Sequence, residues 1–137
     1  MKSAIIIFPG TNRDSDMVMA LEKISGIPPK KVWYNEGELP AVDLFVLAGG
    51  FAYGDYLRVG AMAARAPVIR ALADRAAKGT AVLGVCNGFQ ILTESGLLPG
   101  ALMRNTKLKF ICQNLDVRVE ETDSIFTKKY QPGQKLS

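Results

Sequence analysis

The chain has 137 residues, of which 48% are hydrophobic and 22% are charged, and its net charge is +4. That length and balance fit one globular domain with a buried core, and two widely spaced cysteines argue against a disulfide framework. No apolar run is long enough to span a bilayer, and the basic excess is too weak for a nucleic-acid-binding surface. We therefore expect a cytoplasmic protein that binds neither membrane nor nucleic acid.

Apolar runs and helix signals alternate along the chain. An apolar run at 3–8 predicts a strand buried on both faces, and a helix is expected over about 14–25. Four residues are predicted to form the apolar stripe of that helix: Met17, Ala20, Leu21 and Ile24. The other predicted elements are strands at 30–35, 43–48 and 80–85, helical segments over 60–78 and 87–96, and one or two strands within 108–121.

Strands that alternate with helices are typical of βαβ units. The pattern predicts an α/β protein with a mostly parallel, doubly wound sheet and helices on both of its faces. In such sheets, ligands bind at the carboxyl ends of the strands. The loops after Phe8, Ala48 and Val85 lie at that edge, and they carry the most chemically distinctive residues of the chain.

The segment from Gly84 to Gly88 has the G-x-C-x-G spacing of a nucleophile elbow, with Cys86 at the corner. Glycines permit a tight turn, and the N-terminus of the following helix favours the thiolate form of the cysteine. The N–H of Asn87 is then placed to donate to an oxyanion. The alternative is a small buried core cysteine, which is the role expected of Cys112 in its predicted strand.

A glycine pair, Gly49-Gly50, directly follows the predicted strand at 43–48. A backbone without side chains can approach a ligand closely, so the N–H of Gly50 or of Phe51 is a candidate second oxyanion donor. The alternative is a plain glycine turn. Together with the elbow, the pair favours a nucleophilic site at this sheet edge.

These segments together resemble the class I glutamine amidotransferases. The matching stretches are "FPGTNRDSD", "GGFAYGD", the elbow, "LLPGALMRN" and "KFICQ", in order along essentially the whole chain. Within that family, the chain is similar to glutaminase subunits of an ATP-dependent synthase of purine biosynthesis. The resemblance implies the flavodoxin-like fold of the family, and hydrolysis of L-glutamine through a thioester on Cys86 that supplies ammonia to the synthetase subunit.

The resemblance also implies roles for individual residues. Cys86 matches the nucleophile, and Gly50 and Asn87 match the backbone donors of the oxyanion hole. The residues expected to bind the substrate are Gln90, Phe51, Asn105 and Phe110. Two simpler roles stay open, an exposed helix residue for Gln90 and a turn residue for Asn105.

The catalytic triad of the family also needs a histidine and a glutamate from an Ala-His-x-Glu stretch toward the C-terminus. This chain contains no histidine, and it ends about where the strand leading to that stretch is expected. We therefore expect a single amidotransferase domain over residues 1–137 that is truncated at its C-terminus. Because the leaving ammonia needs a proton donor, we expect the 137-residue chain alone to be inactive.

No phosphate-binding loop is found, because neither "GTNRDS" nor "GGFAYG" fits G-x-x-x-x-G-K-[ST]. We expect no cofactor or metal in this chain, and the resemblance places ATP and magnesium on the synthetase partner, with a small accessory subunit as a further partner. Two other functions stay open. One is a pseudoenzyme or binding module, which the missing histidine supports; the other is a cysteine-elbow glyoxalase or deglycase, which Gln90 and "GGFAYGD" argue against.

Overall fold

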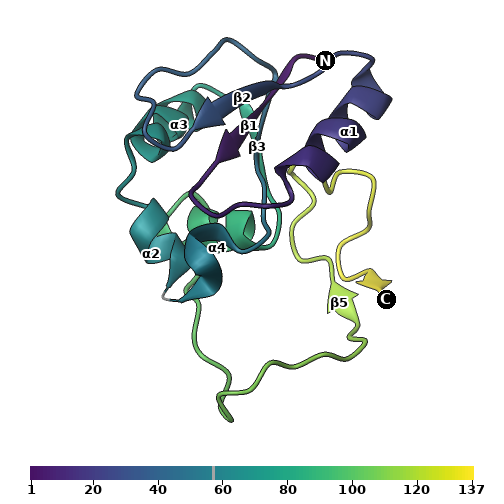
Figure 1. Ribbon diagram of the computed structural model, residues 1–137. Helices are drawn as coiled ribbons and strands as arrows, with labels where there is room; N and C mark the ends of the chain where they lie inside the picture. Colours follow the sequence, from purple (N-terminus) through teal and green to yellow (C-terminus); the bar gives the residue numbers. More distant parts are fainter. Residues whose placement is uncertain (57) are drawn as a thin grey trace. The chain divides into compact units, whose positions relative to one another are not determined.

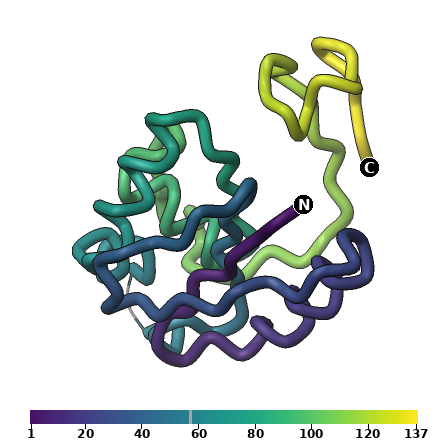
Figure 2. Tube along the Cα trace, turned by 90° about the horizontal axis from the view of Figure 1, so that it is seen from above, coloured from purple at the N-terminus to yellow at the C-terminus, as the bar shows by residue number. Residues whose placement is uncertain are grey.

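The computed structural model describes residues 1–56 and 58–137 of the chain. They form two compact units, Met1–Leu102 and Met103–Ser137, and each is described by itself (Figures 1 and 2). The expectation of a single domain stays a prediction. None of the described helices is long and apolar enough to cross a membrane, and the cytoplasmic location likewise stays a prediction.

A parallel sheet forms the centre of the first unit. Its strands are β1 (Ser3–Ile7), β2 (Lys30–Trp33), β3 (Leu44–Leu47) and β4 (Ala81–Gly84), in the order β2-β1-β3-β4. The register places Ile6 opposite both Val32 and Leu47, and Leu47 opposite Gly84. Successive connections run in opposite directions from β1, so the topological switch point lies between β1 and β3. The predicted α/β fold with a mostly parallel sheet is confirmed.

Helices cover both faces of this sheet (Figure 1). They are α1 (Asp14–Ser25), α2 (Val59–Ala63), α3 (Pro67–Ala77) and α4 (Asn87–Glu94), with a short 3₁₀ turn η1 (Ala52–Asp55). Alternate residues of the strands supply two apolar clusters, because successive side chains of a strand point to opposite faces. Ile5 and Val46 pack with Leu21 of α1, whereas Ile6 and Phe45 pack with α3 and α4.

Helix α1 buries a different stripe from the one predicted. Leu21 is buried, and Met17 and Val18 pack beside it against the sheet. Ala20 is exposed and Ile24 is 80% exposed. Val18 lies on the opposite side of Leu21 from Ala20, so the apolar arc is rotated away from Ala20 and Ile24. The sequence offered apolar residues on both sides, and contact with β1 and β3 selected one of them.

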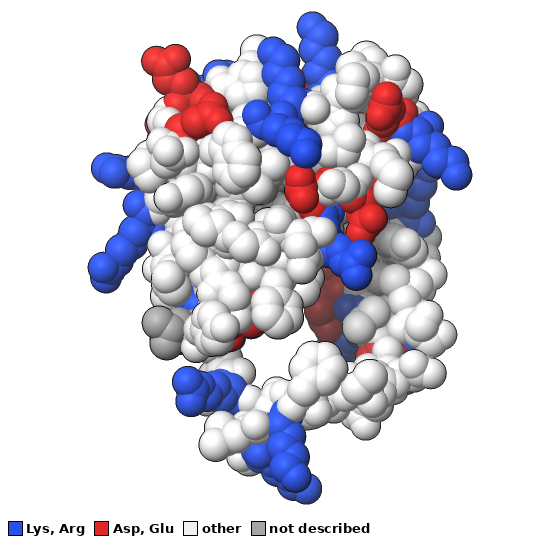
Figure 3. Space-filling model, in the orientation of Figure 1, with Lys and Arg blue, Asp and Glu red and all other residues white. Residues whose placement is uncertain are grey.

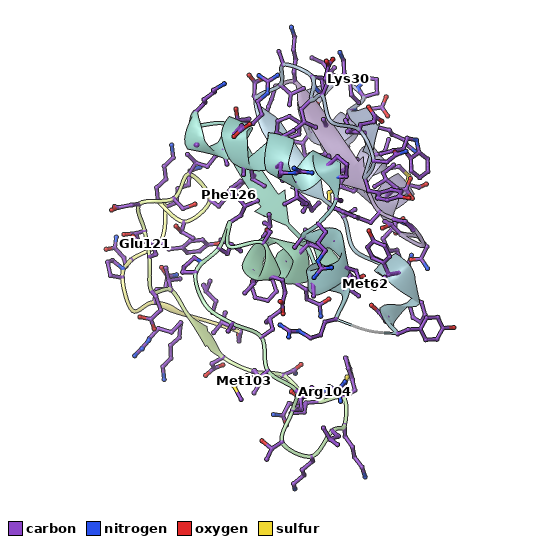
Figure 4. The ribbon with its side chains drawn as sticks, turned by 90° about the vertical axis from the view of Figure 1, so that its left-hand side faces the viewer. Lys30, Met62, Met103, Arg104, Glu121 and Phe126 are labelled. Carbon is purple, nitrogen blue, oxygen red and sulfur yellow. The ribbon has the colours of Figure 1, made fainter. Side chains whose placement is uncertain are left out.

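Helices α2 and α4 pack closely against each other. Met62, which is labelled in Figure 4, belongs to α2. Arg58, just before α2, contacts both carboxylate oxygens of Glu94 at 2.5 and 2.6 Å. The hydrogen bond to Glu94 and the charge of its carboxylate raise the pKa of Arg58 above its usual value. This ion pair ties the segment before α2 to the last turn of α4.

The second unit contains little regular structure. Its strands β5 (Val117–Arg118) and β6 (Lys135–Leu136) form a two-residue antiparallel ladder, where the chain doubles back on itself (Figures 1 and 2). Four of its exposed side chains are labelled in Figure 4, namely Met103, Arg104, Glu121 and Phe126.

The strand prediction for 108–121 is therefore right only at β5. The apolar residues before it pair with no other strand of the second unit, and a ribbon this short cannot bury them. Cys112 is exposed and lies outside any strand, so its expected role in a strand core is wrong.

Buried and exposed apolar side chains should differ in what they contribute to stability. Leu72 of α3 is fully buried, so Leu72→Ala should lower the free energy of unfolding by about 2–5 kcal/mol, through lost burial and the cavity that remains. Ile24→Ala is the matched control on α1, and it should change that energy by no more than about 0.5 kcal/mol. Urea unfolding followed by circular dichroism measures both. A large loss for Ile24→Ala would mean that the stripe predicted from the sequence is the buried one.

Candidate active site

Cys86 occupies the corner between β4 and α4. Its backbone has φ 54° and ψ −113°, a conformation that is costly for a residue other than glycine and is found chiefly at functional sites. Its side chain is exposed, which argues against the alternative of a buried core cysteine. Because Cys86 is the N-cap residue of α4, the positive end of the helix dipole lies beside the thiol.

The glycines around the corner allow α4 to lie directly on the end of β3. A Cβ atom on Gly88 would lie only 2.0 Å from the carbonyl oxygen of Leu47, and a Cβ on Gly84 would lie 2.7 Å from the backbone of Gly88. The N–H of Val85 also donates to that Leu47 oxygen at 3.0 Å. The G-x-C-x-G spacing is therefore explained by close backbone contacts between helix and strand.

The loop after β3 brings a second set of backbone groups to Cys86. A Cβ atom on Gly49 would lie 2.6 Å from the Cβ of Cys86, so the two backbones touch. Gly50 has a φ of 96°, which favours glycine. None of the described residues accepts a hydrogen bond from the N–H of Gly50, Phe51 or Asn87. These three N–H groups are therefore free of other acceptors in the described part of the chain, and their role as oxyanion donors stays a prediction.

The rest of this loop is held in an unusual backbone conformation. Phe51, Tyr53 and Asp55 all have positive φ, at 64°, 52° and 53°. The N–H of Tyr53 donates to the carbonyl of Pro9 at 2.6 Å, and the ring of Tyr53 packs against Phe8 with centroids 6.2 Å apart. Burial, and to a lesser degree the neighbouring Tyr34, raises the pKa of Tyr53, so its hydroxyl is uncharged at neutral pH. Such strain persists only where surrounding contacts hold the loop.

The side chain of Asn87 connects this loop to the elbow. Asn87 is 2% exposed, and its Oδ1 accepts a hydrogen bond from the N–H of Ala52 at 3.1 Å. Its Nδ2 donates to Oδ1 of Asp55 at 2.8 Å and to Oε1 of Gln90 at 3.0 Å. Neither the Asn87 carboxamide nor Asp55 was predicted from the sequence to serve the site. The available signal was a polar residue in each of the two glycine-rich motifs.

The structure brings five of the predicted site residues together in the first unit. They are Cys86, Gly50, Phe51, Asn87 and Gln90, with Phe51 and Gln90 exposed beside the corner. Asn105 and Phe110 belong to the second unit, so their place in the substrate site stays a prediction. Within that unit, Asn105 donates to the carbonyl of Lys109 and accepts from the N–H of Leu108, as the turn alternative expects.

Among the described residues, no three His, Cys, Asp or Glu side chains lie close enough to hold a metal ion. On the face shown in Figure 3, basic and acidic side chains are interspersed over the upper part, with no dense basic patch among the residues drawn there. A cavity of about 380 Å³ between the loop at 37–39 and α3 shares no residue with the elbow. The groups that the described residues bring to the elbow are the Cys86 thiol, backbone N–H groups and the hydrogen-bonded Asn87 and Asp55 side chains.

The contact between α4 and β3 generates a testable prediction. Gly88→Ala would push a Cβ into the backbone of Leu47, which cannot move aside as a flexible side chain would. We expect it to lower the free energy of unfolding by about 1–3 kcal/mol or more. Gly37→Ala is the control, because its Cβ would meet no atom within 4 Å and its φ is not positive. Thermal unfolding should separate the two variants, and equal midpoints would contradict the close contact.

Comparisons with known proteins identify the family of the chain. Residues 1–136 match the CobB/CobQ-like glutamine amidotransferase domain. The chain is 60% identical over 136 residues to the phosphoribosylformylglycinamidine synthase subunit PurQ of Mesorhizobium japonicum, covering 99% of this chain and 61% of that protein. It is 64% identical to the subunit of the same name from Bradyrhizobium diazoefficiens, covering 99% of this chain and 59% of that protein.

A solved structure is similar as well. The chain superposes with a TM-score of 0.82 and 43% identity on a chain of the PurLQS structure from Thermotoga maritima, covering 98% of this chain and 63% of that one. The chain thus spans about three fifths of the length of the relatives it matches. Since the domain match covers nearly all of its residues, this chain belongs to the CobB/CobQ-like glutamine amidotransferase family.

Proposed function

We propose that this chain forms part of a glutaminase subunit of phosphoribosylformylglycinamidine synthase, which hydrolyses L-glutamine and supplies ammonia to a synthetase subunit in purine biosynthesis. The observation that carries the proposal is the exposed Cys86 at its strained corner, beside unoccupied N–H groups. The names of the relatives support the choice of synthase, and they favour it over the glyoxalase or deglycase alternative.

The geometry suits the formation of a thioester. The Cys86 thiolate attacks the side-chain amide carbon of glutamine, and the carbonyl oxygen becomes an oxyanion between the N–H groups of Asn87 and of Gly50 or Phe51. Collapse of this intermediate breaks the C–N bond, and the leaving nitrogen takes a proton to depart as ammonia. Water then hydrolyses the thioester to give glutamate and the free thiol.

One component of this reaction is not supplied by the 137 residues. Proton transfer from the thiol to the leaving nitrogen needs a general acid and base, and this chain has no histidine. The family resemblance assigns that role to the histidine of an Ala-His-x-Glu stretch. The same lack of histidine favours the second candidate function, a pseudoenzyme or binding module on this fold.

The partners are part of the proposal. We expect L-glutamine as the substrate, bound with the help of Gln90, Phe51, Asn105 and Phe110. The synthetase subunit would carry ATP and magnesium, and a small accessory subunit would complete the assembly. The relatives support this because they are named as subunits of a synthase, and the similar solved chain belongs to a structure named PurLQS.

Selective alkylation tests the nucleophile. A diazoketone analogue of L-glutamine should modify Cys86 and leave Cys112 unmodified, although both are exposed, because only Cys86 lies at a helix N-terminus beside oxyanion donors. Excess L-glutamine should slow the modification, as intact-mass and peptide mass spectrometry can show. Cys86→Ala should abolish it, and the control Cys112→Ala should preserve it. Equal modification of both cysteines, without protection by glutamine, would overturn the proposed function.

The rate of ammonia release tests whether the reaction needs a histidine that this chain does not contain. The purified 137-residue chain should release ammonia from glutamine about 10²–10⁴-fold more slowly than a full-length relative assembled with its synthetase, because it lacks a residue to protonate the leaving nitrogen. A coupled glutamate dehydrogenase assay measures this release, with Cys86→Ala as the background. Release at a rate close to that of the assembled relative would contradict the need for an external histidine.

A further inference from the structure

The Asn87 carboxamide is a buried polar group that the thioester mechanism does not use. Asn87 is one of three buried polar residues of the chain's described part, with Ser3 and Thr93. Its three hydrogen bonds reach Ala52 and Asp55 on the loop after β3, and Gln90 one turn further along α4. A single side chain therefore joins the two segments that carry the candidate oxyanion donors, and it also contacts a candidate substrate-binding residue.

The chemistry of its partners fixes which way this amide points. The backbone N–H of Ala52 can only donate, so it must face Oδ1 of Asn87. The carboxylate of Asp55 can only accept, so it must face Nδ2. Both partners demand the same orientation, and the remaining hydrogen on Nδ2 is directed at Gln90. Gln90 must therefore present its Oε1 to Asn87, as the structure has it.

The first consequence concerns residues 49–55, the loop after β3 that carries two of the candidate oxyanion donors, which we call the oxyanion loop. The Ala52 N–H and the Asp55 carboxylate lie at the two ends of η1, so the two bonds to Asn87 flank Tyr53 and Gly54, which both have positive φ. Phe51, which also has positive φ, directly precedes the first of these bonds. Anchors on both sides hold such a strained stretch in place. Because the anchoring residue also carries one of the candidate donor N–H groups, its side chain sets the spacing between that donor and the other.

The second consequence concerns the polarity of Gln90. Gln90 is exposed, and with its Oε1 bonded to Asn87, its NH₂ group has no acceptor among the described residues. That group can only donate hydrogen bonds. It therefore suits the α-carboxylate of an amino-acid substrate, which only accepts, and it does not suit the α-ammonium group, which only donates.

We propose that the Asn87 side chain is a positioning residue that anchors the oxyanion loop to the elbow and orients Gln90 to donate to the substrate carboxylate. This inference rests on the proposed glutaminase function for its substrate. Its two parts can be tested separately. Anchoring of the loop acts on the reacting carbonyl group, whereas the orientation of Gln90 acts on recognition of the amino-acid end of the substrate.

Exchanging the amide of Asn87 and the carboxylate of Asp55 tests the two parts of the proposal separately. Asn87→Asp keeps an acceptor for the Ala52 N–H, but it places a carboxylate against Asp55 and forces Gln90 to reverse its amide. The double variant Asn87→Asp/Asp55→Asn restores a donor opposite an acceptor, so it should anchor the loop again. Gln90 stays reversed in the double variant, because position 87 still offers only acceptors.

The measurement uses the 137-residue chain and the glutamine-analogue diazoketone. The proton of the Cys86 thiol passes through water to the diazo carbon, and the thiolate then displaces N₂ as the Sγ–C bond forms, so the step balances without a histidine. The inactivation rate constant kinact reports the geometry at the ketone, and the half-saturating concentration KI reports recognition. Hydrogen exchange of residues 49–55 reports the anchoring directly.

Relative to the unsubstituted chain, Asn87→Asp should lower kinact about 10-fold or more, raise KI about 10-fold and remove protection of 49–55. The double variant should recover the protection of residues 49–55 and a kinact within about threefold of that of the unsubstituted chain, while KI stays raised about 10-fold. Gln90→Glu keeps an acceptor for Asn87 and removes the free donor, so it should raise KI alone. It also provides a test on an exposed residue, should Asn87→Asp fail to fold.

Each result has a distinct meaning. A double variant that recovers neither kinact nor protection would overturn the proposal that Asn87 anchors the loop. A double variant that also recovers KI, or a Gln90→Glu variant with unchanged KI, would overturn the proposal that Asn87 orients Gln90 to donate to the substrate carboxylate. Labelling of the unsubstituted chain without protection by glutamine would overturn the proposed function instead, and hydrogen exchange would still decide whether Asn87 anchors the loop.

Discussion

The site depends on the direct contact between the first turn of α4 and the carboxyl end of β3. Gly88 lies so close to the Leu47 carbonyl that no side chain fits between them, and the neighbouring Val85 N–H bonds to the same oxygen. This contact places the N-terminus of α4 at the sheet edge and forces the chain to turn sharply at Cys86. The strain at Cys86 is thus the local result of packing a helix directly on a parallel strand.

The position of β3 in the sheet explains why the loop after it can serve the elbow. In the order β2-β1-β3-β4, strands β3 and β4 are neighbours, so the glycine pair after β3 meets the corner after β4. The loop after β1 lies on the other side and receives the Tyr53 N–H at Pro9. Three loops at one sheet edge therefore support each other, with Asn87 as the buried polar link between two of them.

Much of the fold could be predicted because its signals are local. The apolar run of β1, the helix over about 14–25 and the strand at 43–48 are read within a few residues, and each has its counterpart in the structure. The predicted stripe of α1 was wrong at Ala20 and Ile24, because apolar residues flank Leu21 on both sides of the helix. The strand prediction for 108–121 was right only at β5, because high strand propensity does not create a strand without a partner to pair with.

The sequence by itself determined the alternation of strands and helices, the corner at Cys86 and the glycine pair beside it, because spacing along the chain encodes these features. Only the tertiary structure decided the strand order, the face that α1 buries and the partners of Asn87. The bond from Ala52 to Asn87 joins residues 35 positions apart, so no local pattern could reveal it. The backbone groups that the sheet brings to that carboxamide decide that it is buried and hydrogen-bonded and does not face water.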